Sequence, residues 1–224
     1  MNQLHDLLPL AVGILISPLP VVAIIAIILA PRGRTAAPAY ASVFIGVSLG
    51  VVMVGALTAA GSSSVSPSGT AKTVSFVLAI VLALGFAALA IASWLSRPRH
   101  DQPSRTPAWL AALDAVTPGK AATLALIMAV TNTKNIPLAL KGGALIGEAH
   151  LSLLSAGGLC LALVVAGSLP LIIAAAVATS GSTAVTKALE RVKTEMIAHN
   201  AMIMTVLFAT LAANEAAQVI RHLA

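Results

Sequence analysis

Charged residues are scarce in this sequence. Of 224 residues, 13 are Lys or Arg and 7 are Asp or Glu, so 9% are charged, against roughly 25% in an ordinary soluble domain. Hydrophobic residues make up 58%. So few charges cannot cover the surface of a soluble protein of this size, and so much apolar sequence excludes intrinsic disorder. The composition predicts an all-α polytopic membrane protein.

Aromatic residues and cysteine are scarce as well. Tyr40 is the only tyrosine, and Trp94 and Trp109 are the only tryptophans. Because few side chains are available to stack on bases, we expect no nucleic-acid partner and ascribe the net charge of +6 to loops that face anionic lipid. Cys160 is the only cysteine, so it cannot form an internal disulfide, and its apolar surroundings favour packing.

Motifs for enzymatic chemistry are also missing from the sequence. Its His, Cys and carboxylate residues show no metal-ligand spacing, and it contains no P-loop. Acidic residues are almost absent from the apolar runs, so no Ser-His-Asp set can be assembled there. We therefore expect a protein that is not an enzyme and holds no cofactor or metal.

Six apolar runs are long enough to cross a bilayer, whose hydrocarbon core takes about 20 helical residues. The segment before the first run contains no Lys or Arg, so we expect that run to be a retained helix rather than a cleaved signal peptide. The predicted spans are 7–30, 37–60, 73–95, 121–147, 151–179 and 197–219.

The basic residues outside these spans are divided unequally between the two sides. One side carries two, Lys72 and Arg221, and the other carries nine. This asymmetry predicts that the nine-base side is cytoplasmic and that both termini face out. The nine residues are Arg32, Arg34, Arg97, Arg99, Arg105, Lys120, Lys187, Arg191 and Lys193.

Residues 97–120 divide the chain into two halves of three spans, 1–96 and 121–224. The Pro-rich first part predicts a cytoplasmic linker, and residues 107–116 predict a short interfacial helix. Residues 184–195 form a second amphipathic segment, which we expect to be solvated or to lie among lipid head groups. Three spans in each half make the halves enter the membrane from opposite sides, which predicts an inverted repeat.

The first span of each half is interrupted by polar residues and proline at its middle. Proline removes a backbone donor, and exposed carbonyls are costly in lipid, so both breaks should face protein or water. Transporters with inverted repeats often place their binding site at such breaks, near the midplane. We predict a substrate or ion path formed by Ser17, Pro18 and Pro20 in the first span and by Thr131, Asn132, Lys134, Asn135 and Pro137 in the fourth.

Lys134 is the most informative residue of this set. It lies 14 residues from both Lys120 and Glu148, which is roughly 21 Å of helix at about 1.5 Å per residue. A lysine at the bilayer centre costs about 2.5 to 3.5 kcal/mol on insertion scales. We therefore expect Lys134 to face a wet cavity, a cluster of carbonyls or an anion.

Other polar and small residues are weaker candidates. Lys141 lies about 10 Å nearer the outer face and is able to reach the interface. Asp114 and Glu215 are considered as proton sites, although Glu215 also suits an interfacial position. Glycines permit close helix contact within the chain or in a homodimer, namely Gly46 with Gly50 and Gly157 and Gly158 with Gly167.

The sequence resembles the GAP family of glycolipid-addressing proteins, which includes the sulfolipid-addressing protein and lies within the LysE transporter superfamily. The resemblance spans the chain and is carried by Ser17-Pro18-Leu19-Pro20, by the stretch from Ala30 to Arg34, by Leu113-Asp114, and by Asn132-Thr133-Lys134-Asn135. Thr133 stands where the family usually has proline. The resemblance implies movement of envelope glycolipids across a bacterial inner membrane.

Our leading hypothesis is a secondary exporter that moves an amphipathic lipid or glycolipid from the cytoplasmic to the outer leaflet through a midplane cavity at the two breaks. Export of a small amino acid or other solute is an alternative, and a scaffold that docks envelope-lipid synthesis enzymes on the basic loops is another. Expected partners are membrane lipids, the lipid substrate and that synthesis or export machinery. Because no nucleotide motif is present, an ion gradient or a partner must supply the energy.

Overall fold

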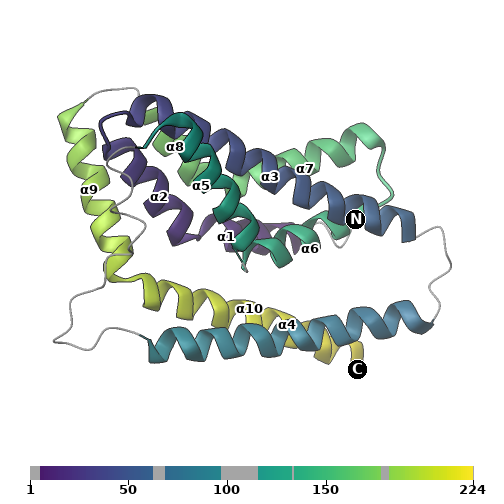
Figure 1. The fold of residues 1–224 in the computed structure, drawn as a ribbon. Helices are drawn as coiled ribbons and strands as arrows, with labels where there is room; N and C mark the ends of the chain where they lie inside the picture. Colours follow the sequence, from purple (N-terminus) through teal and green to yellow (C-terminus); the bar gives the residue numbers. More distant parts are fainter. Residues whose placement is uncertain (1–5, 63–68, 97–115, 133, 178–181, 224) are drawn as a thin grey trace. The chain divides into compact units, whose positions relative to one another are not determined.

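A computed structural model of the chain describes residues 6–62, 69–96, 116–132, 134–177 and 182–223 (Figure 1). These ranges are helical and contain no strand. The predicted linker and interfacial helix lie largely outside the described residues, which resume at residue 116. The helices are α1 (Leu7–Leu15), α2 (Pro18–Leu29), α3 (Gly33–Ser62), α4 (Gly69–Leu95), α5 (Pro118–Thr131), α6 (Asn135–Glu148), α7 (Leu153–Gly167), α8 (Leu169–Val177), α9 (Thr183–Ala198) and α10 (Asn200–Leu223).

Three of the six predicted spans are pairs of helices. The first span is α1 and α2, which bend by 44°, and the fourth is α5 and α6. Both breaks fall where the sequence predicted them. The prediction of one continuous helix over 151–179 is wrong, because α7 and α8 bend by 63° at Ser168. Pro170 lies in the first turn of α8, where proline is tolerated because its N–H is not needed.

The described helices support a helical membrane protein. Two of them, Gly33–Gly61 and Asn200–Ala217, are long and apolar enough to cross a membrane alone. Counting each of the bent pairs α1–α2 and α7–α8 as one span raises this number to four. The six-span inverted repeat therefore stays a prediction.

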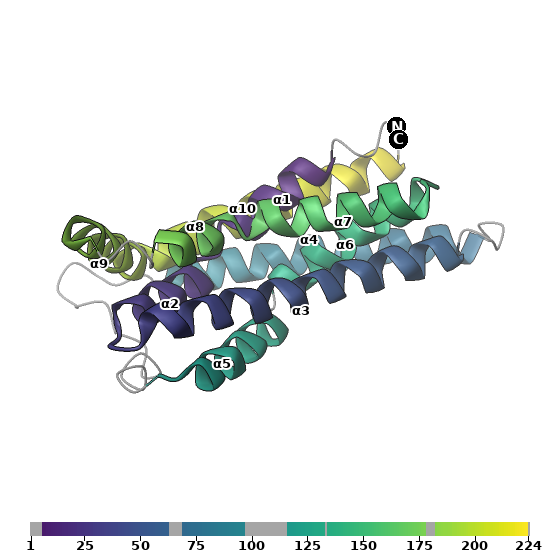
Figure 2. The ribbon, with the colours of Figure 1, turned by 90° about the horizontal axis from the view of Figure 1, so that it is seen from above.

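The chain forms two compact units. The first comprises 1–62 and 106–197, and the second comprises 63–105 and 198–224. In the second unit α4 and α10 pack on each other, and the rings of Phe86 and Phe208 stack with centroids 6.1 Å apart. All the other helices belong to the first unit, in which α5 and α6 lie along the long helix α3 (Figure 2).

The core of the first unit is built around α2. Its residues from Pro20 to Ile27 are all buried, as expected of a helix that is apolar on every side. The side chain of Tyr40, on α3, is also fully buried and stacks on Phe44 at a centroid distance of 6.2 Å. Its hydroxyl donates a 3.3 Å hydrogen bond to the Pro20 carbonyl. This core holds the start of α2, and therefore the first break, against α3.

Glycines allow α3 and α6 to approach each other closely. A Cβ at Gly143 would overlap the Val52 carbonyl, and one at Gly147 would overlap the Ala56 carbonyl. Gly55 faces α6 in the same way. The sequence analysis missed this Gly-x-x-x-Gly pair. Of the glycines it did choose, only Gly167 packs closely in the first unit, against Ile14, whereas a Cβ at Gly46, Gly50, Gly157 or Gly158 would meet nothing within 4 Å.

Candidate functional site: a buried lysine at two helix breaks

The first break leaves two carbonyls without helical donors. Ile16 has φ −79° and ψ 66°, an inverse γ-turn in which the Ser17 N–H bonds the Leu15 carbonyl at 2.9 Å. In a continuous helix that N–H would bond the Gly13 carbonyl instead. The Ile16 carbonyl would be bonded by the N–H of residue 20, which Pro20 lacks.

The second break presents Lys134 at the start of a new helix. Helix α5 ends at Thr131, and Lys134 precedes the first residue of α6. Asn132 closes the turn, because its backbone and side-chain oxygens accept hydrogen bonds from the Asn135 N–H at 3.0 and 3.2 Å. Pro137 is the third residue of α6, a position where its missing N–H costs little. The break thus forms although residue 133, itself outside the described residues, is threonine.

Lys134 supplies the donors that the first break lacks. Its Nζ lies 2.8 Å from the Gly13 carbonyl and 2.6 Å from the Ile16 carbonyl, and the residue is only 2% exposed. The acceptors belong to the C-terminal end of α1, where the helix dipole favours a cation. The sequence analysis expected Lys134 to face a wet cavity, a cluster of carbonyls or an anion. The structure shows the cluster of carbonyls.

The charge of Lys134 is solvated by dipoles and not by an acid. Among the described residues, no carboxylate lies within ion-pairing distance of its Nζ. Two hydrogen bonds to a charged donor contribute about 1.5 to 3 kcal/mol each, which is comparable with the insertion cost of about 2.5 to 3.5 kcal/mol. An ammonium group has three N–H donors, so one N–H remains after the two hydrogen bonds to the carbonyls. The two hydrogen bonds thus offset much of the cost of placing the ammonium form here, and one N–H donor remains for another partner.

A further hydrogen bond ties the two breaks together. The Asn132 side-chain amide donates to the Ser17 hydroxyl at 3.2 Å, and Ser17 is 6% exposed. Pro18 begins α2 directly after Ser17 and is also buried. Thr131 takes no part in this link, because its exposed hydroxyl donates to the Ile127 carbonyl of its own helix at 2.7 Å. The structure thus brings together most of the predicted set.

Asn135 points to a second polar feature beside the lysine. The residue is 8% exposed, and its Oδ1 has no hydrogen-bond partner among the residues that the structure describes. It lines a cavity of about 20 Å³ together with Ser48 of α3 and Ser168, the residue at the third break. A cavity needs about 10 to 15 Å³ to hold a water. The arrangement suits one water molecule among three polar side chains.

The sequence analysis missed Ser48 and Ser168. Ser168-Leu169-Pro170 places serine shortly before proline inside a long apolar run, as Ser17-Pro18-Leu19-Pro20 does at the first break. That similarity was the available signal for Ser168. No comparable signal marks Ser48, whose position depends on how α3 packs.

Three candidates of the sequence analysis remain. Lys141 is half-buried on α6, beyond the break. Glu215 is 2% exposed and belongs to α10 in the second unit. Asp114 lies outside the described residues. Within the part of the chain that the structure describes, no three His, Cys, Asp or Glu residues are grouped to hold a metal.

The fold and the site together define a helical membrane protein with a lysine-centred polar cluster at interrupted helices. A family model described as "Sap, sulfolipid-1-addressing protein" matches residues 7–220, so the chain belongs to this family. The resemblance to glycolipid-addressing proteins is thereby confirmed, whereas membership of the LysE superfamily stays a prediction. No curated protein and no solved structure matches the chain.

Proposed function

We propose that the protein is a secondary exporter that moves an amphipathic lipid or glycolipid from the cytoplasmic to the outer leaflet of the bacterial inner membrane. It transports its substrate and does not convert it. The family description, which names a lipid, supports the class of cargo. The observation that carries the proposal is that, among the described residues, the buried Lys134 ammonium is held by neutral carbonyls of a broken helix and by no acid.

The mechanism that we propose uses Lys134 as a latch. Its two hydrogen bonds hold the fourth predicted span to the end of α1. An anionic head group that reaches the ammonium competes with these carbonyls, because a full negative charge attracts it more strongly than a dipole does at low dielectric. Loss of the two bonds releases the helices from each other. A substrate that binds the released state better shifts the protein toward it.

The proposed topology agrees with the arrangement of the first unit. The turn at Pro31–Arg32 and the start of α9 line one pocket, so two basic connections lie at the same end of that unit. We assign this end to the cytoplasm, with both termini outside. Each compact unit also contains corresponding spans from both halves of the chain. The last span of each half, which is the third and the sixth predicted span, belongs to the second unit. An inverted repeat with a two-fold axis would produce this division.

Replacement of Lys134 tests the proposal. We expect Lys134→Ala to lower delivery of the lipid to the outer leaflet at least tenfold, and Lys134→Arg to retain part of the activity because the positive charge remains. Lys187→Ala, at an exposed position of α9, is the matched control and should be active. Full activity of Lys134→Ala at normal membrane levels would refute the latch.

Purified protein separates this function from the alternatives. In proteoliposomes an autonomous exporter moves the lipid across the bilayer without other proteins. A scaffold for envelope-lipid synthesis would show no movement under the same conditions. Efflux of amino acids or other small solutes, with no lipid movement, would favour the other transport hypothesis.

A further inference from the structure

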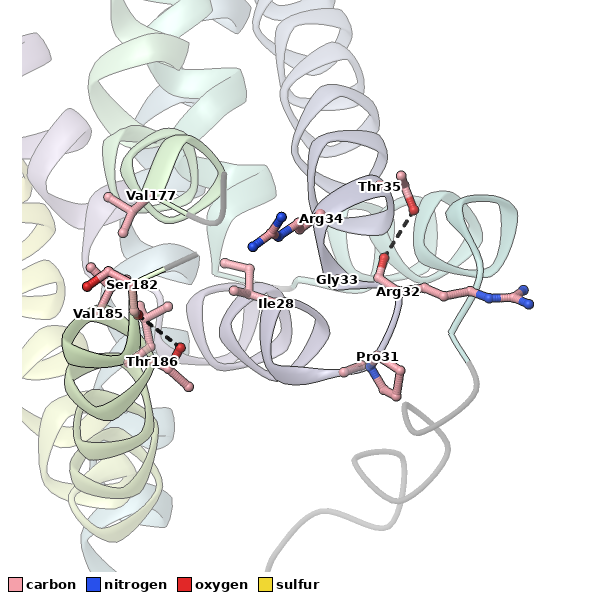
Figure 3. A pocket seen from close by; sticks show the side chains of 12 residues that line it. Ile28, Pro31, Arg32, Gly33, Arg34, Thr35, Val177, Ser182, Val185 and Thr186 are labelled. Carbon is pink, nitrogen blue, oxygen red and sulfur yellow. Dashed lines mark hydrogen bonds between the residues drawn. The ribbon is translucent and has the colours of Figure 1, made fainter. Parts of the chain in front are cut away.

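A large pocket lies in the first unit, away from the Lys134 cluster. It is a cavity of about 440 Å³ between the turn that joins α2 to α3, the end of α8 and the start of α9 (Figure 3). Both of its edges come from segments that the charge distribution assigns to the cytoplasmic side. A position at the membrane edge and a volume typical of ligand sites, about 300 to 1,000 Å³, make it a candidate binding site.

Two arginines, Arg32 and Arg34, line the pocket, and their side chains point in different directions. Figure 3 shows the Arg34 guanidinium turned toward Ile28 and Val177, whereas the side chain of Arg32 extends away from α9. None of the described residues that line the pocket is acidic. Arg34 also lies in the first turn of α3, where the helix dipole adds positive potential. The charge in the pocket is therefore available to an anion.

Hydroxyl and carbonyl groups from the α2–α3 turn and from the start of α9 add polar contacts. The Thr186 hydroxyl donates to the Ser182 carbonyl at 3.2 Å, and the Thr35 hydroxyl donates to the Arg32 carbonyl at 3.1 Å. Each of these oxygens keeps lone pairs that accept hydrogen bonds from the hydroxyls of a sugar or glycerol. Together with Arg34, these groups offer one strong anion contact and several weaker contacts for a polar head group.

Four side chains form the aliphatic wall of the pocket. It consists of Ile28 from α2, Val177 at the end of α8, and Val185 and Leu189 on one face of α9. Leu189 packs against the core, which fixes this face of α9 toward the pocket. A water occupies about 30 Å³ in the liquid, so a cavity of about 440 Å³ is far larger than a bare phosphate or sulfate needs. A charged group beside aliphatic side chains suits an amphiphile.

We propose that this pocket binds the anionic head group of an amphiphile, a phosphate, sulfate or carboxylate, with Arg34 as its charged contact and the aliphatic wall against the start of its tail. Binding itself does not depend on transport. Its role as the site where cargo is loaded from the cytoplasmic leaflet rests on the function proposed above.

The chain offers a matched pair of variants for the test. Arg34→Gln removes the charge that points into the pocket, and Arg32→Gln removes the charge of the second lining arginine, whose side chain extends away from α9. The full chain in detergent is mixed with phosphatidylglycerol or phosphatidylcholine, and retained lipid is counted by native mass spectrometry. We expect wild type and Arg32→Gln to retain phosphatidylglycerol preferentially and Arg34→Gln to bind it about tenfold more weakly, a change equivalent to 1.4 kcal/mol.

Several results would overturn the proposal. Equal losses in Arg32→Gln and Arg34→Gln would show a general charge effect, and no loss in Arg34→Gln would show that the pocket is not the site. Equal retention of the two lipids would exclude recognition of the anion. Helicity by circular dichroism and elution volume verify that each variant is folded.

Competition distinguishes a lipid head group from a free anion. Inorganic phosphate and a short-chain alkyl phosphate are added to the complex with phosphatidylglycerol. We expect the alkyl ester to displace the lipid at least tenfold more effectively, because only it contacts the aliphatic wall. Equal displacement would refute the assignment to an amphiphile. None of these measurements depends on transport. Their results therefore stay the same if the Lys134 latch is refuted. Conversely, a negative binding result does not count against the latch, which the delivery assay tests.

Discussion

The Lys134 ammonium lies 2.6 Å from the Ile16 carbonyl, the group that loses its helical donor because residue 20 is proline. The lysine of one break thus satisfies a carbonyl that the other break exposes. Each feature alone is costly in a membrane, since a lone ammonium and a lone carbonyl both lack water there. Their pairing explains how the two interruptions are tolerated and why they occur together.

Restoring the missing donor should weaken the latch. In Pro20→Ala the new N–H is able to bond the Ile16 carbonyl and so competes with Lys134. We expect α1 and α2 to become more continuous and lipid delivery to fall severalfold. Pro38→Ala is the control, because Pro38 is exposed inside α3 and away from both breaks. Hydrogen exchange of residues 13–20 and a delivery assay provide the measurement. Unchanged exchange and delivery in Pro20→Ala would contradict the pairing.

Lys134→Met separates a structural from a functional role of the lysine. The variant leaves the carbonyls of Gly13 and Ile16 unsatisfied, at a cost of about 1 to 3 kcal/mol each. It also removes an ammonium whose insertion costs about 2.5 to 3.5 kcal/mol. Because these changes largely offset each other, we expect the melting temperature in detergent to move by only a few degrees while delivery is lost. A large fall in melting temperature with delivery retained per folded molecule would assign Lys134 to stability alone.

Both breaks at the centre of the site were predictable because proline and a deep charge are strong local signals. Pro18 and Pro20 cannot continue a helix hydrogen-bond pattern, and Lys134 is too far from either end of its span to reach water. What the sequence could not predict was the acceptor. The carbonyls of Gly13 and Ile16 are backbone groups that every residue has, and only the packing of α6 on α1 selects them.

Helix packing was less predictable than the breaks. Gly46 and Gly50 have the same spacing as Gly143 and Gly147, yet only the second pair faces a neighbouring backbone in the first unit. Spacing places two glycines on one face of a helix, but it does not say which face meets another helix. The break at Ser168 was missed for a related reason, since Pro170 alone is compatible with a kink or with an uninterrupted run.

The two glycine pairs should respond oppositely to alanine. In Gly143→Ala the added methyl overlaps the Val52 carbonyl, so we expect a loss of about 1 to 3 kcal/mol in the free energy of unfolding. In Gly46→Ala the methyl meets nothing, so the higher helix propensity of alanine should stabilise the protein by up to about 1 kcal/mol. Denaturant titration in mixed micelles measures both. Similar changes in the two variants would contradict the packing of α3 on α6.

The buried Oδ1 of Asn135 predicts that a variant without it is at least as stable as the wild type but less active. In Asn135→Leu the buried Oδ1 is removed and its place beside the cavity is taken by an apolar group, while the backbone N–H still bonds Asn132. Removal of an unsatisfied buried group is worth about 1 to 3 kcal/mol, so we expect an equal or higher melting temperature. If the polar cavity belongs to the path of the head group, delivery should nevertheless fall severalfold. Asn132→Leu is the control, because it breaks the bond to Ser17 and should lower both stability and delivery. A stabilised Asn135→Leu protein with full delivery would remove this cavity from the path.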